Sequence, residues 1–349
     1  MRLKAKTTCG ESTMAVRERI TVALDAMGGD NAPTANVLGA LDARDELGVD
    51  VLLVGDEAVL AGEMDSASRG RLRVLHAPDT VAMGEEGAFA IKNREGASIV
   101  VAAEAVREGR AQAMVSAGNT GAAMAAAFFS WGRIKGIKRP AVAVVLPPLQ
   151  SPTLLLDAGA NSDCRPEHLR QFALLGSAYA SLRFNLDRPR VGLMNIGVEE
   201  SKGNELAREA FPLLSSEARI EFVGNVEGRD LAGGAADVVV TDGFTGNVIL
   251  KVVEGVASLI TRQLMENLGS LKEEELQPVL PALLALRQEL DYRAIGGAPL
   301  LGVKGVCIIA HGSSDAAAIK NSIRVAAEAV ETGVVEKTAV LLGSGKGSG

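Results

Sequence analysis

Aromatic residues and cysteines are scarce in this 349-residue chain, and no uninterrupted apolar run is long enough to cross a bilayer. Only 3% of the residues are aromatic, so we expect a core built from Val, Leu, Ile and Ala. The three cysteines, Cys9, Cys164 and Cys307, lie far apart without C-x-x-C spacing, which favours neither a disulfide framework nor a zinc knuckle. These absences favour a reduced, cytoplasmic enzyme.

Basic residues are fewer than acidic residues, with 36 Lys and Arg against 43 Asp and Glu. The formal net charge of −7 argues against a general nucleic-acid-binding protein, whose footprint would be basic. Residues 1–19 are polar and lack the apolar core of a signal peptide, so we expect a flexible extension in which Met1 and Met14 are alternative starts. Residues 336–349 end in "GSGKGSG" and predict a flexible tail. Residues 20–335 are expected to form a single catalytic domain.

Short β-branched runs recur along the chain and alternate with segments of helical periodicity. The runs are 20–26, 49–55, 72–77, 111–118, 141–147, 152–159, 190–197, 220–225, 237–243 and 305–312, and the helical segments include 33–47, 94–109, 166–182, 203–215 and 315–332. Continuous apolar strands between helices are typical of a parallel sheet that is covered on both faces. The sequence therefore predicts an α/β fold with three layers, α/β/α, and a largely parallel sheet.

One segment, from about residue 247 to 293, is helical almost throughout and predicts a projecting arm of two helices. Its tip, "LQPVLPALLALRQEL" (276–290), carries more leucine than a solvated hairpin should show. We expect a dimer interface there first, and contact with a membrane surface or a lipid chain second.

Six strands are followed by loops of glycine with Asp, Asn, Ser, Thr or His. These loops lie in 22–33, 114–124, 154–163, 193–204, 238–251 and 308–318. Taken one at a time, such residues make turns and helix caps. We expect all six at one edge of the sheet, where glycines and helix N-termini favour an anion, so together they predict a phosphate site.

Several catalytic signatures are missing. No loop fits G-x-G-x-x-G or G-x-S-x-G, and His311-x-x-x-Asp315 is one residue short of the H-x-x-x-x-D signature of glycerolipid acyltransferases. None of the cysteines lies in a loop typical of a catalytic thiol. We therefore expect no covalent acyl-enzyme, and a nucleophile that arrives with the substrate.

The loops occur in the order typical of one bacterial family. "VALDAMGGDNAP", "VSAGNTGA", "GRIKGIKRPAVA", "LLLDAGAN", "RVGLMNIGVEESKGNEL", "VVVTDGFTGNVILK" and "IIAHGSSDAAAIKNSI" resemble the phosphate acyltransferases (acyl-[acyl-carrier-protein]–phosphate acyltransferases) of phospholipid synthesis, from about Ile20 to about Val335. The resemblance implies transfer of a fatty acyl group from acyl carrier protein to inorganic phosphate, giving an acyl phosphate. A membrane acyltransferase would then pass the acyl group to glycerol 3-phosphate.

The same resemblance implies a fold similar to isocitrate dehydrogenase and phosphotransacetylase, a homodimer, and peripheral association with the membrane. No metal and no cofactor is expected, because a related fold alone does not justify one. Three other functions stay open: a metal-dependent decarboxylating dehydrogenase, acyl transfer between acyl phosphate and coenzyme A, and a non-catalytic adaptor at a lipid surface.

Three residues are the candidates for catalysis. Lys202, in "ESKGNE", suits phosphate or the tetrahedral oxyanion, although a solvated surface lysine is the common alternative. Asn247 can donate its amide to substrate, can cap the helix that follows, or can do both. His311 either protonates the departing thiol or is a structural histidine. The resemblance adds a set of substrate-binding residues: Asp25, Gly28, Gly29, Asn31, Ser116, Gly118, Asn119, Thr120, Gly121, Asp157, Asn161, Asn195, Gly203, Asn204, Asp242, Gly243, Thr245 and Gly246.

Within that set, the carboxylates Asp25 and Asp242 cannot attract phosphate, so we expect them to order loops or to bind pantetheine amides. Asn119 and Thr120 either contact ligand or form a packed turn. The segment "GRIKGIKRP" gathers Arg133, Lys135, Lys138 and Arg139 in an otherwise acidic chain. It is either a docking site for the acidic carrier protein or a solvated basic loop.

Overall fold

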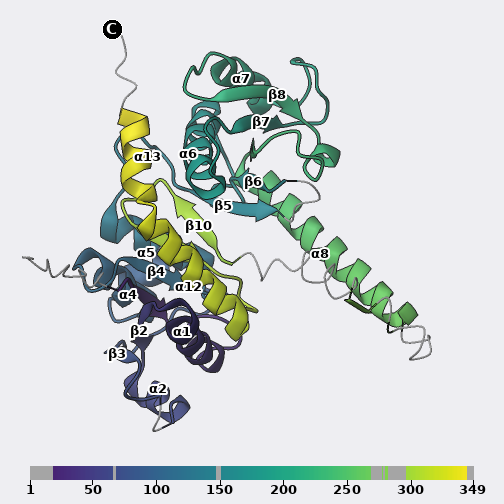
Figure 1. Ribbon diagram of the computed structural model, residues 1–349. Helices are drawn as coiled ribbons and strands as arrows, with labels where there is room; N and C mark the ends of the chain where they lie inside the picture. The colour runs from purple at the N-terminus through teal and green to yellow at the C-terminus, as the bar shows by residue number, and fades with distance from the viewer. Residues whose placement is uncertain are drawn as a thin grey trace, which may run out of the picture.

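The computed structural model describes residues 19–65, 68–146, 151–268, 277, 280, 281 and 296–343, and these residues form a three-layer α/β/α structure (Figure 1). Within them, one 11-stranded sheet has the order β3-β2-β1-β4-β11-β10-β5-β6-β9-β7-β8. The prediction of an α/β fold with three layers and a largely parallel sheet is confirmed.

The strands are β1 (Thr21–Asp25), β2 (Asp50–Gly55), β3 (Arg73–His76), β4 (Ala113–Ser116), β5 (Ala141–Leu146), β6 (Thr153–Leu156), β7 (Arg190–Met194), β8 (Glu221–Val226), β9 (Val238–Val240), β10 (Ala298–Leu301) and β11 (Val306–Ile309). The helices are α1 (Thr34–Leu47), α2 (Glu57–Glu63), α3 (Gly87–Asn93), α4 (Ser98–Arg107), α5 (Thr120–Trp131), α6 (Pro166–Phe184), α7 (Glu205–Ser215), α8 (Gly243–Leu268), α12 (Ala316–Glu331) and α13 (Val334–Gly343), with a 3₁₀ turn, η1 (Gly228–Asp230). Each of the ten apolar runs contains a strand, whereas β10 was not predicted.

Strand β10, together with β5, lies between two groups of parallel strands. It is antiparallel to β11 and to β5, and β5 is antiparallel to β6. The strands from β3 to β11 are parallel to one another, as are those from β6 to β8, so the sheet has two parallel halves that run in opposite directions. The expectation that all six loops share one edge is therefore wrong. The loops after β1, β4 and β11 lie at one edge, and those after β6, β7 and β9 lie at the other.

Both faces of the sheet are buried, as continuous apolar strands require. Along β1, Val22 and Leu24 pack into one core cluster while Ala23 packs into another on the opposite face. Helices α1, α6 and α12 contribute to the first cluster, and α4 and α5 contribute to the second. The alanine-rich α5 lets the helix layer approach the sheet closely, so few aromatic residues are needed to fill the core.

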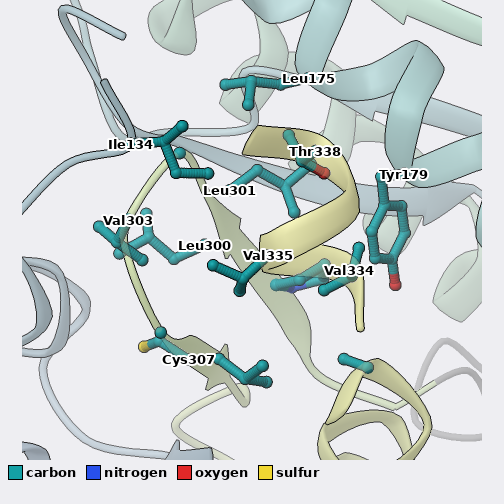
Figure 2. Close-up of a pocket in the computed structure, with 15 residues that line it drawn as sticks. Ile134, Leu175, Tyr179, Leu300, Leu301, Val303, Cys307, Val334, Val335 and Thr338 are labelled. Atoms are coloured by element: carbon teal, nitrogen blue, oxygen red, sulfur yellow. The ribbon is translucent and has the colours of Figure 1, made fainter. Parts of the chain in front are cut away.

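Helix α13 corrects the predicted tail. Residues 334–343 are helical, and Val334 and Thr338 are buried. Figure 2 shows Val334, Val335 and Thr338 around one small apolar pocket with Leu301 of β10 and Tyr179 of α6. The chain is therefore helical as far as Gly343, and the part of the predicted tail beyond that residue lies outside the described residues.

Helix α8 is the first helix of the predicted arm, and it projects away from both halves of the sheet (Figure 1). In the part of the chain that the structure describes, it is the one helix whose length and composition would suit a membrane span, and 11% of its most apolar window is buried. The predicted tip lies outside the described residues, apart from positions 277, 280 and 281.

Candidate functional site

A cavity of about 780 Å³ lies where the two halves of the sheet meet. Four of the predicted site residues line it: Gly118 and Thr120 after β4, Asn247 on α8, and His311 after β11. Further walls are apolar and include Val142, Val144, Leu250, Pro299 and Ile309. The cavity therefore combines a polar lining suited to an anion with an apolar lining suited to a hydrocarbon chain.

Helix α8 is the element that joins the two opposite edges. It begins at Gly243, with two residues between it and the end of β9, and its third turn reaches the loop that follows β11. There Lys251 Nζ lies 3.2 Å from His311 Nε2. Eight residues of helix span about 12 Å, which is enough to cross the junction between the halves. Residues from both edges thus reach one cavity although their strands run in opposite directions.

The loops after β1 and β4 are packed together around Asp25. This buried carboxylate accepts hydrogen bonds from Ser98 Oγ at 2.6 Å and from Ser116 Oγ at 2.7 Å. Burial raises the pKa of Asp25 above its ordinary value. A Cβ placed on Gly28 would lie 2.6 Å from Asp25 Oδ2 and 2.7 Å from the Gly118 nitrogen. Asp25 and Gly28 therefore set the position of the Gly118 loop, and neither lines the cavity.

Asn119 forms a packed turn, one of the two alternatives expected for it. Its Oδ1 accepts from the Ala122 nitrogen at 2.9 Å and caps α5. Its Nδ2 donates to three backbone carbonyls of the segment before α3, those of Ala82, Met83 and Glu85, at 3.2, 3.1 and 2.8 Å. The Asn119 amide thus ties this segment to α5, while its neighbour Thr120 lines the cavity.

Helix α3 itself sits tightly on this turn. A Cβ on Gly87 would lie 2.2 Å from the Ala122 nitrogen and 2.4 Å from the Gly121 carbonyl carbon. The small residues Gly87 and Gly121 therefore allow the two helix N-termini to touch.

The loops after β1 and β11 are also joined. Asn31 Nδ2 donates to the carbonyls of Ser313 and Ser314 at 3.2 and 3.1 Å, and the Asp30 nitrogen donates to the Gly312 carbonyl at 2.7 Å. Gly29 has φ +109°, a conformation that favours glycine, and a Cβ there would lie 3.2 Å from the Gly312 oxygen. Asn31 and Gly29 therefore hold the His311 loop in place.

Asp157 organises the loop after β6. Its carboxylate accepts hydrogen bonds from the backbone nitrogens of Val142, Gly159, Ala160 and Asn161 at 2.7–3.1 Å, and from Asn161 Nδ2 at 2.8 Å. Burial raises the pKa of Asp157, while these hydrogen bonds act in the opposite direction. Asn161 Nδ2 also donates to the Pro140 carbonyl at 2.8 Å. Both side chains are committed to this loop and to the start of β5.

The two glycines of "TDGFTGN" are explained by close packing. A Cβ on Gly246 would lie 1.8 Å from the Asp157 carbonyl oxygen, and one on Gly243 would lie 2.7 Å from the Asn161 carbonyl oxygen. Asp242 begins the helix, because its carboxylate accepts from the Thr245 nitrogen at 2.9 Å and from Thr245 Oγ1 at 2.8 Å.

Because Asp242 is the cap, the alternative role of Asn247 as an N-cap is wrong. Asn247 lies inside α8 with its side chain 3.7 Å from the Cβ position of Gly159, and it lines the cavity. The first turn of α8 packs tightly on the loop after β6, and this packing places Asn247 in the cavity lining.

The structure does not bring Lys202 to this cavity. Asn195 Nδ2 donates to the Lys202 carbonyl at 3.1 Å, Gly203 has φ +95°, and Asn204 caps α7 through the Ala207 nitrogen at 2.9 Å. These contacts order the loop after β7, on which the Lys202 side chain is exposed. With the other described residues Lys202 makes no ion pair. Its assignment to the site stays a prediction.

Lys251 is the residue that the sequence analysis missed. Its ammonium lies 2.8 Å from Glu254 Oε2 and 3.2 Å from His311 Nε2, and His311 Nδ1 lies 2.8 Å from Ser313 Oγ. A signal was present, because Asn247 and Lys251 are four residues apart and so share one face of a helix. This spacing alone does not distinguish Lys251 from the many exposed lysines that belong to no functional site.

The basic segment "GRIKGIKRP" lies between α5 and β5. Arg133, Lys135, Lys138 and Arg139 are all exposed. Arg133 Nη1 donates to the Lys138 carbonyl, and the Arg133 guanidinium lies 5.4 Å from the Phe128 ring centroid. The segment is therefore an ordered, positively charged surface.

Two further observations bear on the chemistry. Burial raises the pKa values of Cys164 and Cys307 to about 12, so neither thiol supplies a thiolate near neutral pH. Over the described ranges, no group of three His, Cys, Asp or Glu side chains is placed to hold a metal ion.

The architecture is a phosphotransacetylase-like α/β fold. Over 90% of this chain and 95% of the other, the fold matches a phosphotransacetylase from Streptococcus pyogenes with a TM-score of 0.61 at 13% identity. EutD phosphotransacetylase from Staphylococcus aureus matches with a TM-score of 0.58 at 15% identity, over 89% of this chain and 94% of the other. At these identities the likeness shows the fold alone.

Sequence comparison is more specific. The model of the family described as "Fatty acid synthesis protein" matches residues 20–337. A phosphate acyltransferase of Desulforamulus reducens is 50% identical over 330 residues, which cover 94% of this chain and 99% of that protein. A phosphate acyltransferase of Pelotomaculum thermopropionicum is 50% identical over 318 residues, with 90% and 93% coverage. The chain belongs to this family of fatty acid synthesis proteins, and it is an acyltransferase.

Proposed function

We propose that the protein transfers a fatty acyl group from acyl carrier protein to inorganic phosphate and so forms an acyl phosphate for phospholipid synthesis. The relatives named phosphate acyltransferase support this activity, because they align along nearly the whole chain. The observation that carries the proposal is the cavity at the junction of the two halves. Its apolar walls suit an acyl chain, Asn247 supplies an amide donor, and Lys251 supplies positive charge for phosphate.

The reaction needs little from the protein beyond position and charge. A phosphate oxygen attacks the thioester carbon, a C–O bond forms, and the C–S bond breaks as the thiolate leaves with its electron pair. Phosphate is already anionic near pH 7, so no strong base is required. A thiol with a pKa of about 8.5 leaves readily and then takes up a proton. What remains is to hold both partners in line and to stabilise the oxyanion.

Different residues of the chain position the substrates and stabilise the oxyanion. The Asn247 amide faces the cavity and donates to the substrate, while Gly118, Gly159 and Gly312 allow backbone to approach it closely. Lys202 remains a proposed second cation. Its loop follows β7 at the same edge of the sheet as the start of α8, so a cation there would lie beside the substrate as it enters.

The acyl carrier protein is the proposed macromolecular substrate. Exposed Arg133, Lys135, Lys138 and Arg139 offer it a positively charged surface in a chain whose net charge is −7. Opposite charge on an acidic carrier would speed its encounter and orient it.

The exposed face of α8 supports a homodimer. Phe244, Val248, Val252 and Val256 are 67%, 48%, 57% and 48% exposed, and their spacing of four places them along one side of the helix. A second copy of the chain is the first proposed occupant of this face, and a membrane surface is the second. A cytoplasmic enzyme at the membrane surface would deliver its acyl phosphate to the membrane glycerol-3-phosphate acyltransferase.

The test is phosphate-dependent release of acyl carrier protein from palmitoyl-carrier protein by the purified protein, without added metal or nucleotide. Turnover that saturates with phosphate is the expected result. A parallel assay with palmitoyl-coenzyme A separates this activity from transfer that involves coenzyme A. No turnover by folded protein with intact substrates would overturn the proposal.

A further inference from the structure

Lys251 stands out because three polar groups meet at one point of the cavity wall. On the basis of the proposed function, we propose that Lys251 binds the attacking phosphate and that His311 positions its ammonium group. Lys251 and Glu254 come from α8, which belongs to one half of the sheet, whereas His311 follows β11 in the other half. All three side chains line the same cavity.

The geometry leaves Lys251 with a donor to spare. A lysine ammonium carries three N–H donors and no acceptor. One donor is directed to Glu254 Oε2 at 2.8 Å and a second to His311 Nε2 at 3.2 Å. The third is available to a phosphate oxygen in the cavity. A lysine is a compact point charge that suits phosphate without demanding one fixed orientation.

The contact with Lys251 also fixes the role of His311. Because an ammonium can only donate, Nε2 must accept, and the ring proton then lies on Nδ1, directed to Ser313 Oγ at 2.8 Å. The Ser313 nitrogen lies 3.2 Å from Nδ1 and would favour the other tautomer. The charge-assisted contact is the stronger of the two and decides the assignment. His311 is therefore a positioning residue, and not the thiol's proton donor that the sequence suggested.

The pair with Glu254 does not compete seriously with substrate. The Lys251 side chain is 51% exposed and the Glu254 side chain is 16% exposed, so the carboxylate is the more buried partner. Because the ammonium has a third donor, it can bind phosphate without giving up its carboxylate partner. Gly118, Gly159 and Gly312 line the same cavity.

The experiment is a titration of inorganic phosphate into wild type, Lys251→Met and Lys251→Arg, followed by calorimetry, with steady-state kinetics on palmitoyl-carrier protein in parallel. Loss of one charge-assisted hydrogen bond predicts at least about a tenfold rise in the phosphate Kd and KM for Lys251→Met. Lys251→Arg is expected to recover part of that loss. The KM for palmitoyl-carrier protein should stay within about twofold, because Lys251 is not part of the proposed docking surface for the carrier.

Lys320→Met is the matched control. Lys320 forms a comparable ion pair with Glu46 at 2.7 Å but does not line the cavity, so phosphate binding should not change. His311→Ala separates the two roles of the histidine. A positioning role raises the phosphate Kd, whereas a proton donor lowers kcat and leaves phosphate binding intact.

An unchanged phosphate Kd in folded Lys251→Met would overturn the inference whether or not the enzyme turns over. Because the binding measurement does not require turnover, an inactive wild type would count against the proposed function alone.

Discussion

Gly246 on α8 lies directly against Asp157 in the loop after β6, so that a Cβ on the glycine would sit 1.8 Å from the Asp157 carbonyl oxygen. Because the atom it would meet belongs to the backbone, a side chain at this position could be accommodated only if the helix or the loop moved. The contact fixes the position of the start of α8 against the loop after β6. It thereby fixes the positions of Asn247 and Lys251 in the cavity wall.

Gly246→Ala is therefore expected to lower the free energy of unfolding by about 2–3 kcal/mol through overpacking, and to reduce phosphate-dependent turnover. Urea denaturation and the carrier-protein release assay measure the two effects. Gly255→Ala on the same helix is the control, because a Cβ there meets nothing within 4 Å. That control should be neutral or stabilising by up to about 1 kcal/mol. Equal behaviour of the two variants would mean that the close contact has no consequence.

Lys202→Ala tests the cation of the β7 loop. If Lys202 stabilises phosphate or the oxyanion, turnover should fall by about 100-fold. Because the side chain is exposed, the free energy of unfolding should change by less than about 0.5 kcal/mol. Lys337→Ala, at an exposed site on α13, is the control for charge alone. Near-normal activity in Lys202→Ala would remove this residue from the site.

Glu217 provides a pH-dependent test of the packing between α6 and α7. Hydrogen bonds from Arg219, with a further one from Arg170 of α6, lower the pKa of Glu217 to about 2. In the unfolded chain a glutamate titrates near pKa 4.3. A lowered folded-state pKa stabilises the protein above the unfolded pKa, and the contribution is lost as the pH falls from about 4.3 towards 2.

Wild type should therefore exceed Glu217→Gln in free energy of unfolding by about 1–3 kcal/mol at pH 7, with the difference shrinking towards zero near pH 2. Urea denaturation at pH 7, 5, 4 and 3 gives this difference directly. Glu108→Gln removes an exposed pair with Arg110 and should change stability little at any pH. A difference between wild type and Glu217→Gln that persisted unchanged at pH 3 would contradict the assigned cause.

Sequence patterns predicted the local structure well because that structure depends on near neighbours. Apolar runs with β-branched residues marked ten strands, and helical periodicity marked α1, α4, α6, α7 and α12. Strand β10, "APLL", was missed because it is four residues long, contains proline and follows the long helical segment. Its short sequence carries no sign that it pairs antiparallel with both neighbours.

A reversal of strand direction within the sheet explains the main error about the site. Because β10 is antiparallel to both β11 and β5, those two strands run in the same direction. The antiparallel pairing of β5 with β6 then reverses the rest of the sheet, so glycine loops that look alike in sequence lie at opposite edges. Many of their polar residues, such as Asn119 and Asp157, turned out to bind the loops themselves. This is the ordinary function of Asn and Asp in turns, and sequence alone cannot separate it from ligand binding.

The sequence by itself determined the strands and most of the helices, the α/β class, the glycine-rich loops and the family, because each depends on residue order and local conformational preference. Only the tertiary structure decided which loops meet. The reversal between β5 and β6 and the close packing of Gly246 on Asp157 direct α8 across the junction, so that Lys251 meets His311, sixty residues further along the chain. Such a contact depends on the direction and packing of whole elements, which no local pattern encodes.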